Sequence, residues 1–237
     1  MSKVAVIMAG GLGTRLRPYT VVLPKPLMPV GKYPILGIII KQLANQGFGR
    51  IVLAVNHQAE IIKAYFGDGE DWGVKIDYCL EKKQLGTMGP LTFVDNLPES
   101  FLVMNGDILT DLDYNKFLDA HKNSELMFSI SAAKRIESID YGVLTEENGQ
   151  LLTMSEKPSR SHLVSMGVYA VNYEVINFIP PNEYYGFDNL MNFLIEREIP
   201  VGVLPHDGTW LDIGRPDDYM AAIELVAQRP EFNFDEA

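Results

Sequence analysis

The sequence predicts an α/β protein, a Rossmann-like three-layer sandwich with a mostly parallel central sheet. The apolar run KVAVIM at 3–8 is typical of a strand that is buried on both faces. Glycines follow that strand directly, at the sheet edge where α/β proteins collect ligands. Strand-like runs then alternate with helical spacing of apolar residues, and this alternation predicts parallel strands joined by crossover helices.

The first half of the chain supplies most of the regular elements. Pro34 suits a helix start, and Gly47 ends the helical spacing that follows it. A Gly67-Asp68-Gly69 turn closes the next helix. We predict, in order, a helix over 35–46, a strand over 50–55, a helix over 58–66, a strand over 74–80, a helix over 86–93, a strand over 101–104 and a helix over 114–121.

From residue 125 onward the pattern changes to shorter strands separated by turns. These strands are predicted over 126–133, 142–144, 151–156 and 163–171, before a final helix over 216–228. The chain is expected to form one domain over 1–237, with a regularly wound half over 1–124, a β-rich half over 125–229 and a frayed acidic tail over 230–237.

Composition and charge limit the class of protein. A hydrophobic share of 47% in 237 residues suits a folded domain with a sizeable core. No stretch approaches the roughly 18 apolar residues of a membrane span. The N-terminus lacks signal-peptide features, and the single Cys79 cannot form an internal disulfide, so we expect a cytoplasmic protein. The net charge of −11 argues against nucleic acid or an anionic membrane as a partner.

The run Gly10–Gly13 (GGLG) predicts a phosphate cradle. Without Cβ atoms, its glycines can aim successive backbone N–H groups at one point. Arg15 adds a planar cation, and Lys25 adds another between two prolines that stiffen its backbone. A dinucleotide fingerprint is excluded, because Leu16 stands where a third glycine is needed, and the Gly-Lys-Ser/Thr ending of a P-loop is absent.

Two aspartates are candidates for a metal site. Asp107 follows the strand predicted over 101–104, at the sheet edge that also holds the glycines. Mg²⁺ takes one or two carboxylates there, while phosphates and water complete its shell. A turn or helix-cap role is the alternative for Asp107. Asp212 is the second candidate, because it stands too far before Pro216 to cap the helix that opens there.

The string GGLGTRLRPYTVVLPKPLMPVG, Gly10–Gly31, closely resembles the signature of the sugar-1-phosphate nucleotidyltransferases. Further motifs resemble that family in the same order: Asp140–Val143 (DYGV), Glu156–Pro158 (EKP), Ser165–Tyr169 (SMGVY) and Gly208–Pro216 (GTWLDIGRP). The resemblance implies that residues 1–124 bind a nucleotide and that residues 125–229 bind a sugar phosphate.

The resemblance also implies roles for individual residues and a Mg²⁺ cofactor held by Asp107 and Asp212. The implied catalytic residues are Arg15, Lys25, Asp107 and Asp212. The nucleotide would be bound by Ala9, Gly10, Gly11, Gly13, Thr14, Arg15, Glu81, Gly86 and Thr87. The sugar phosphate would be bound by Gly142, Glu156, Lys157 and Ser165.

Three features depart from the family pattern. Ser165 stands where members often carry Asn in contact with the sugar. On the side of the base, Met88 and Pro90 replace small residues. Many relatives carry a C-terminal β-helix that adds acyl transfer or allostery, and we expect none in this chain.

The implied reaction joins a nucleoside triphosphate to a sugar 1-phosphate, giving a nucleotide sugar and pyrophosphate. The DYGV and GTWLDIGRP motifs look closest to guanylyltransferases, so GTP is favoured, while uridylyl, thymidylyl or cytidylyl transfer stays open. Two other classes compete: a glycosyltransferase with Asp111 and Asp113 as its metal pair, and a non-catalytic nucleotide-sugar sensor. We favour Asp111 and Asp113 as caps of the helix over 114–121. The oligomeric state stays open.

Overall fold

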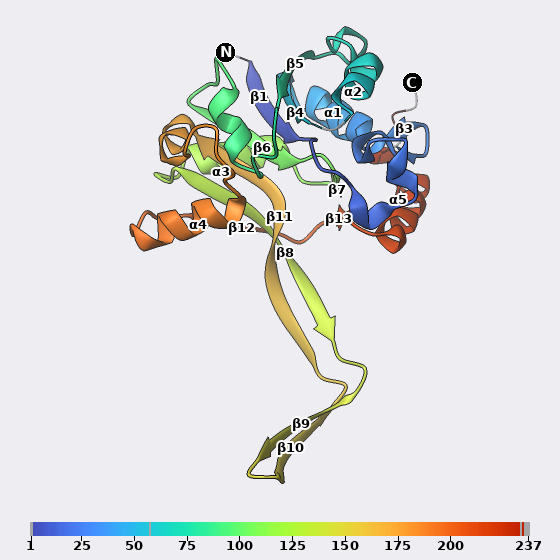
Figure 1. The fold of residues 1–237 in the computed structure, drawn as a ribbon, viewed down its shortest axis with the longest axis vertical. Coiled ribbons are helices and arrows are strands. Elements are labelled where there is room, and N and C mark those ends of the chain that lie inside the picture. The colour runs from blue at the N-terminus through green and yellow to red at the C-terminus, as the bar shows by residue number, and fades with distance from the viewer. Residues whose placement is uncertain (1, 57, 233, 235–237) are drawn as a thin grey trace.

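The computed structural model describes residues 2–56, 58–232 and 234. Its centre is a seven-stranded sheet (Figure 1), whose strands in spatial order are β12 (Gly202–His206), β8 (Phe128–Ser138), β11 (Ser159–Asn172), β6 (Ser100–Asn105), β1 (Lys3–Met8), β4 (Phe48–Val55) and β5 (Lys75–Leu80). Only β11 runs antiparallel to its neighbours. The predicted mostly parallel α/β sheet is confirmed.

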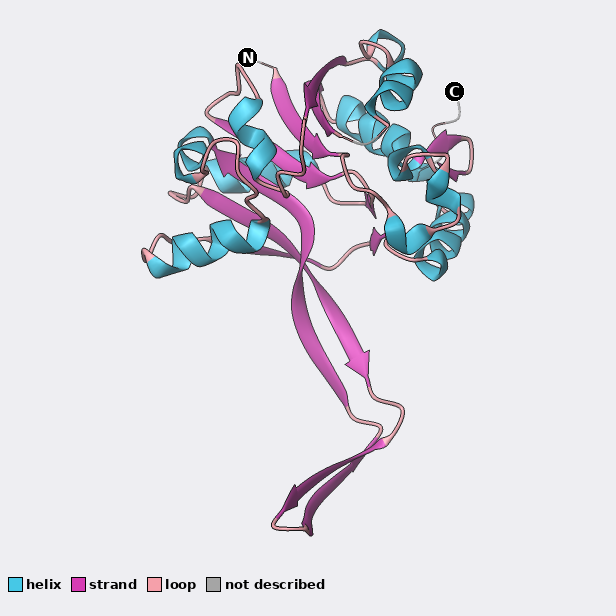
Figure 2. Ribbon diagram, viewed as in Figure 1, coloured by secondary structure: helices cyan, strands magenta, loops and turns pink. Residues whose placement is uncertain are grey.

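Helices cover both faces of this sheet and complete three layers (Figure 2). One face packs on the helices α1 (Ile35–Asn45), α2 (Ala59–Phe66), α3 (Tyr114–Lys122) and α5 (Pro216–Gln228). The other face packs on α4 (Phe187–Glu196) and on 3-10 helices at Gly89–Phe93 and Tyr173–Phe178. Because strand side chains alternate, Ile7 enters the first core and Val6 the second, which is why β1 is apolar from Val4 to Met8.

The predicted helix over 86–93 is wrong. The structure has a short 3-10 helix at Gly89–Phe93 instead. Gly86 takes a left-handed conformation with φ of 77°. A regular right-handed helix has no place for this conformation at its start. The backbone N–H groups of Met88 and Gly89 both donate to the carbonyl of Tyr185, which ties this loop to the segment before α4.

Several short strands were not predicted, because tertiary pairing creates them. They are β2 (Pro29–Val30), β3 (Tyr33–Pro34), β7 (Ile108–Thr110), β12 and β13 (Trp210–Asp212). The ten-residue helix α4 was not predicted either. In the predicted tail over 230–237, Pro230–Phe232 forms a 3-10 helix with Phe232 buried in the core, whereas residues 233 and 235–237 lie outside the described residues. Within the described chain, no helix is long and apolar enough to cross a membrane.

The β-rich half extends from the body as a long arm (Figures 1 and 2). β8 and β11 pair inside the sheet, shift register at Ser165, and stay paired outward to Ser138 and Ser159. Beyond them, β9 (Gly142–Glu147) and β10 (Gln150–Glu156) form a separate two-stranded hairpin. We call residues 134–163 the arm. Its stem is 134–138 paired with 159–163, and its hairpin is 142–156.

Candidate active site

The glycine cradle begins where β1 ends. Gly13 has a left-handed φ of 60°, and a Cβ atom there would lie 2.9 Å from Cγ2 of Thr20. The Thr20 hydroxyl donates a hydrogen bond of 2.7 Å to the Gly13 carbonyl. Gly13 is therefore required both by its backbone conformation and by the close approach of Thr20.

A pocket of about 270 Å³ opens beside the cradle. Its walls come from the carboxyl ends of β1, β4, β5 and β6 and from the loops that follow them, as expected for a parallel sheet. The lining residues are Met8, Gly10, Gly11, Asn56, Glu81, Gln84, Leu85, Gly86, Thr87, Asn105, Asp107 and Tyr184. Five of the predicted nucleotide-binding residues and the predicted metal ligand Asp107 thus share one pocket.

Glu81 holds one wall of this pocket. Its Oε2 accepts a hydrogen bond of 3.1 Å from the backbone N–H of Leu85, which fixes the loop after β5. A Cβ atom on Gly10 would lie 3.0 Å from Oε1 of Glu81 and 3.3 Å from Cβ of Asn56, so glycine at this position lets both side chains approach the cradle closely. Burial raises the pKa of Glu81, while the Leu85 hydrogen bond opposes that rise.

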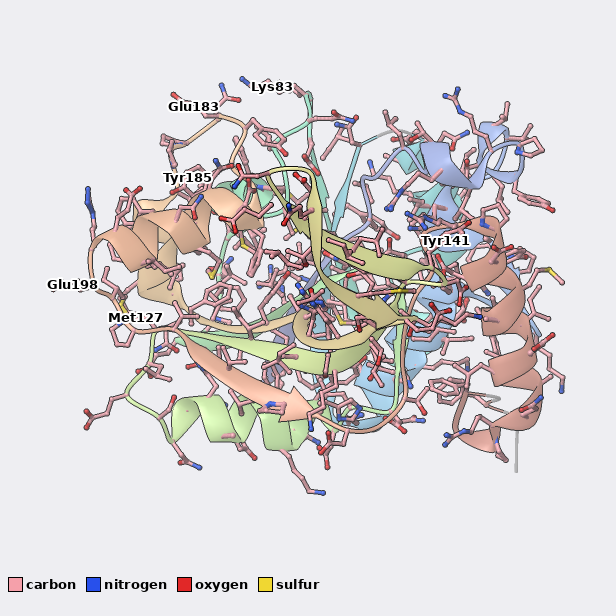
Figure 3. The ribbon with its side chains drawn as sticks, turned by 90° about the horizontal axis from the view of Figure 1, so that it is seen from below. Lys83, Met127, Tyr141, Glu183, Tyr185 and Glu198 are labelled. Atoms are coloured by element: carbon pink, nitrogen blue, oxygen red, sulfur yellow. The ribbon has the colours of Figure 1, made fainter. Side chains whose placement is uncertain are left out.

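The loop after β5 meets the loop before α4 on the same side of the body, where Lys83, Glu183 and Tyr185 are labelled in Figure 3. The backbone N–H of Tyr185 donates a hydrogen bond of 2.8 Å to the carbonyl of Leu85. A Cβ atom on Gly86 would lie 2.7 Å from the Tyr185 carbonyl, so this contact also depends on glycine. The second loop brings Tyr184 into the pocket.

The two candidate metal ligands are brought together by the short strands β7 and β13. These strands pair antiparallel, with Asp212 opposite Ile108, the residue after Asp107. The backbone N–H of Ile213 also donates a hydrogen bond of 3.0 Å to the carbonyl of Asp107. The indole N–H of Trp210 donates a hydrogen bond of 3.0 Å to the Met166 carbonyl and anchors β13 to β11. Two carboxylates from distant segments are thereby fixed on adjacent strands.

Cations accompany these carboxylates. Lys25 is buried, and its Nζ forms an ion pair with Oδ2 of Asp107. The pKa of Asp212 is raised by burial and by the charge of Asp107, while Lys25 and Arg15 oppose the rise. Arg15 approaches from the cradle side, because a Cβ atom on Gly214 would lie 3.5 Å from its guanidinium nitrogens. The four predicted catalytic residues therefore belong to one electrostatic cluster.

The chemistry of this cluster fits a divalent cation. Oδ1 of Asp107 is buried and has no hydrogen-bond partner among the described residues. Burial and the charge of Asp107 both raise the pKa of Asp212, and a bound cation would offset both by favouring the ionised form. In the described ranges there is no group of three or more His, Cys, Asp or Glu residues suited to a metal. The chain therefore offers two carboxylates, the number that Mg²⁺ uses when phosphates complete its shell.

The structure does not bring the predicted sugar-phosphate residues to this centre. Gly142 and Glu156 face each other at the base of the β9–β10 hairpin, and Lys157 follows them, on the arm and away from the body (Figure 1). Ser165 lies at the base of the arm, where its hydroxyl accepts a hydrogen bond from the backbone N–H of Gly167 and donates one to Tyr169. Their sugar-phosphate roles stay predictions.

The two aspartates considered as helix caps differ in the structure. Asp113 caps α3, accepting a hydrogen bond of 2.9 Å from the backbone N–H of Lys116. The prediction for Asp111 is wrong: it accepts hydrogen bonds from His206 and from the backbone N–H of Thr209. Asp111 thus ties the loop after β7 to the segment before β13 and helps to hold the two strands together.

Sequence reasoning missed six residues that line the pocket: Met8, Asn56, Gln84, Leu85, Asn105 and Tyr184. Asn56 follows β4 and Asn105 ends β6, so their places at the carboxyl ends of predicted strands were a usable signal. Gln84 and Tyr184 lie in loops whose sequences have no such signal. Their positions depend on the backbone hydrogen bonds that join the loop after β5 to the loop before α4.

Comparison with known proteins gives a family match over most of the chain. Residues 4–229 match the family described as "Nucleotidyl transferase". The chain is 33% identical over 95% of its length to a UTP–glucose-1-phosphate uridylyltransferase of Synechocystis sp.. It is 33% identical over 93% of its length to the mannose-1-phosphate guanylyltransferase catalytic subunit beta of Dictyostelium discoideum. The matched regions span 63% and 64% of those relatives.

A solved structure supports the same fold. HddC from Yersinia pseudotuberculosis, complexed with GMP-PN, is 26% identical in sequence and superposes with a TM-score of 0.71. The superposition covers 94% of this chain and 99% of that one.

Proposed function

This chain belongs to the nucleotidyl transferase family, and on that premise we propose that it joins a nucleoside triphosphate, with GTP favoured, to a sugar 1-phosphate and releases pyrophosphate. The pairing of β7 with β13 carries the proposal. It sets Asp107 and Asp212 side by side, with Lys25 and Arg15 against them, at the edge of the pocket that the glycines line. A pocket that only bound a nucleotide would not need two carboxylates and two cations together.

The proposed reaction is an in-line displacement at the α-phosphorus. An oxygen of the sugar 1-phosphate forms the new bond to phosphorus, and the bond to the bridging oxygen breaks, with its electron pair leaving on pyrophosphate. A phosphate monoester is already ionised at pH 7, so the attacking oxygen needs no protein base. The residues of the chain therefore act by positioning and by electrostatic stabilisation.

Each group in the cluster has a task in this reaction. Backbone N–H groups of Gly11 and Gly13 bind phosphate oxygens, and Arg15 offsets the charge that develops on the leaving group. Lys25, held by its ion pair with Asp107, offsets charge at the reacting phosphate. Asp107 and Asp212 would hold Mg²⁺, which supplies Lewis-acid neutralisation of the phosphate oxygens.

GTP is favoured over other nucleotides on two grounds. The matched relative from Dictyostelium is named a guanylyltransferase, and the superposed HddC structure carries GMP-PN. The base would lie against Gly10 and Glu81 on one side and against Gly86 and Thr87 on the other. UTP is the main alternative, because the Synechocystis relative is named a uridylyltransferase.

A substrate grid tests the proposal. Pyrophosphate release would be measured with Mg²⁺ for GTP, UTP, dTTP, CTP and ATP against glucose, mannose, glucosamine, N-acetylglucosamine and heptose 1-phosphates. We expect the strongest signal in a GTP column, and product mass would identify the nucleotide sugar. The proposal would be overturned if pyrophosphate were released without any sugar phosphate. It would also be overturned if folded protein released no pyrophosphate with any pair of substrates. Asp107→Asn is the negative control.

A further inference from the structure

The arm presents large apolar side chains to solvent. Ile136, Leu144, Leu151 and Met154 are between 60% and 70% exposed, and Leu152 and Leu163 exceed 50%. A two-stranded ribbon has no core of its own and is marginally stable in water. Contiguous exposed apolar surface of this kind marks an interaction site.

The apolar residues of the stem gather on one face. Lys134 pairs with Leu163 and Ile136 pairs with Ser161, and paired residues share a face. Leu163 and Ile136 therefore lie on the same face of the stem. The other face carries Arg135, Glu137, Arg160 and His162 and is charged or titratable throughout. One face thus carries both large apolar side chains of the stem, beside Lys134 and Ser161, whereas the other face carries none.

The hairpin also gathers apolar side chains on one face, and this face carries Glu146 and the predicted sugar residue Glu156 as well. Leu144 pairs with Met154, and Gly142 pairs with Glu156 two positions further along each strand. Because side chains alternate, Leu144, Met154 and Glu156 share one face. A Cβ atom on Gly142 would lie 2.8 Å from Cε of Met154 and 3.1 Å from Oε2 of Glu156, so both side chains lie over Gly142. Whatever covers the apolar face also meets Glu156.

The arm leaves the sheet at the edge that holds the candidate site. β11 runs antiparallel to both β6 and β8, so β8 has the direction of β6 and β1, and all three end at one edge. The ladder between β8 and β11 continues outward to Ser138 and Ser159. About 20 Å of extended strand separates Ser165 from Ser159, at roughly 3.3 Å per residue. The structure holds the arm in this extended position, away from its own site (Figure 1).

We propose that the arm docks on a second copy of this chain and delivers Glu156 and Lys157 to the partner's catalytic centre. The inference rests on the proposed function, which requires a sugar-phosphate subsite beside Asp107 and Asp212. Each chain carries a centre without those two residues and an arm that holds them away from it (Figure 1). A second copy of the chain completes the centre of the first with its arm and receives the arm of the first at its own centre. This reciprocal exchange of arms gives a closed two-fold dimer.

The body offers a surface that receives such an arm. An apolar groove of about 630 Å³ lies at the base of the stem, lined by residues that include Ile130, Leu163, Phe187, Met191, Ile195 and Val203. Leu163 belongs both to this groove and to the apolar face of the stem, so the two surfaces are continuous. A stem related by a two-fold axis buries its own apolar face along this continuous surface.

The first test measures mass by light scattering. The chain should run at twice the mass of one copy, and the variant Leu144→Ser/Leu151→Ser/Met154→Ser should run as a single copy. These side chains are exposed in one chain, so their replacement should not unfold it. The matched control is Thr145→Ala/Thr153→Ala, on the opposite face of the same hairpin, which should stay dimeric. A wild-type chain that is monomeric at micromolar concentration overturns the proposal.

The second test asks whether the arm acts in trans. Asp107→Asn has a defective centre and an intact arm, whereas Lys157→Ala has an intact centre and a defective arm. Both should be inactive alone. In a hybrid dimer, purified through two different tags after co-expression, one site combines the intact centre with the intact arm, so about half of the wild-type turnover should return.

The outcomes separate the two proposals. A hybrid no more active than its parents, or a Lys157→Ala homodimer as active as wild type, overturns delivery in trans. If the wild type releases no pyrophosphate with any substrate pair but still forms the arm-dependent dimer, the proposed function fails and the docking surface stands.

Discussion

Gly11 and Gly13 stand two positions apart in the cradle but meet different constraints. A Cβ atom on Gly11 would meet nothing within 4 Å, and its φ is not positive, whereas Gly13 combines a φ of 60° with a contact of 2.9 Å to Thr20. Gly13→Ala should therefore lower the free energy of unfolding by about 1–3 kcal/mol, because it strains both backbone and packing.

Urea unfolding checks this difference. Gly11→Ala is the matched control and should stay within about 0.5 kcal/mol of wild type. Equal losses in the two variants would show that the cradle is constrained as a whole and not at Gly13.

Asp107 and Asp113 allow a paired test of the same chemical change. Asp107→Asn removes a charge from the cluster with Lys25 and should lower kcat by about 100-fold or more, the loss seen for one preorganised electrostatic group. Asp113→Asn removes a charge from a helix cap, and Asn caps as well as Asp does, so activity and stability should stay near wild type. Steady-state pyrophosphate release with folded protein is the measurement, and an Asp107→Asn variant within threefold of wild type would exclude that role.

Asp212 illustrates a conflict between stability and the proposed chemistry. Burial and the charge of Asp107 raise its pKa above the ordinary value of 3.8. A group with a raised pKa contributes stability that is fully present below its unfolded-state pKa and is lost as the pH rises through the folded-state pKa. At pH 7 the wild-type protein therefore carries the cost of a second ionised carboxylate, which Asn would avoid.

Asp212→Asn should accordingly raise the free energy of unfolding at pH 7 while it abolishes activity. The gain should stay below about 1 kcal/mol, because part of the Asp212 side chain reaches solvent. Urea unfolding at pH 7, 4 and 3 should show the gain shrinking as the pH falls. A variant that is less stable than wild type at pH 7 would contradict this account.

At the scale of elements, β7 and β13 matter more than their length suggests. Their pairing, the Ile213 bond to Asp107, and the anchor from Trp210 to β11 fix the distance between the two carboxylates. The glycine cradle and the loop after β5 bind the nucleotide in our proposal and do not depend on this pair. Damage to β13 should therefore separate catalysis from nucleotide binding.

Trp210→Phe tests that separation. The change removes the N–H donor to the Met166 carbonyl, at a cost of about 1 kcal/mol in stability. Displacement of Asp212 should lower kcat by about tenfold, because small misplacements of catalytic groups are costly. The KM for the nucleotide should stay within twofold, and a rise in KM at constant kcat would place Trp210 in nucleotide binding instead.

At the scale of the whole molecule, the arm dominates. Its apolar face and the groove at its base are left open in one chain, so the native state is completed by association in our proposal. Unfolding coupled to dissociation makes the midpoint of thermal unfolding depend on protein concentration. Tm should rise by several degrees between about 1 and 100 μM for wild type and stay constant for the Leu144→Ser/Leu151→Ser/Met154→Ser variant. A wild-type Tm that does not change with protein concentration would contradict the coupling of unfolding to dissociation.

Much of the body followed from local pattern. Three elements were predictable from local sequence: the strand over 3–8, the helix that begins after Pro34 and the helix over 216–228. Buried parallel strands and helix ends have patterns that are visible within a short stretch of sequence. The same holds for the cradle, since glycines next to a strand end need no distant residue to be interpreted. Asp107 and Glu81 were predictable as pocket residues through their motifs and their places after strands.

What the sequence by itself determined is the fold class and the identity of the charged groups. Only the tertiary structure decided how those groups meet. The approach of Asp107 to Asp212 depends on a pairing of two three-residue strands. These strands are too short to have a periodic signature, and most of the β-rich half of the chain separates them in sequence. The arm was decided in the same way: the alternation over 142–156 predicts strands, but it cannot say whether they join the sheet or leave it, because strand partners are chosen by long-range contacts.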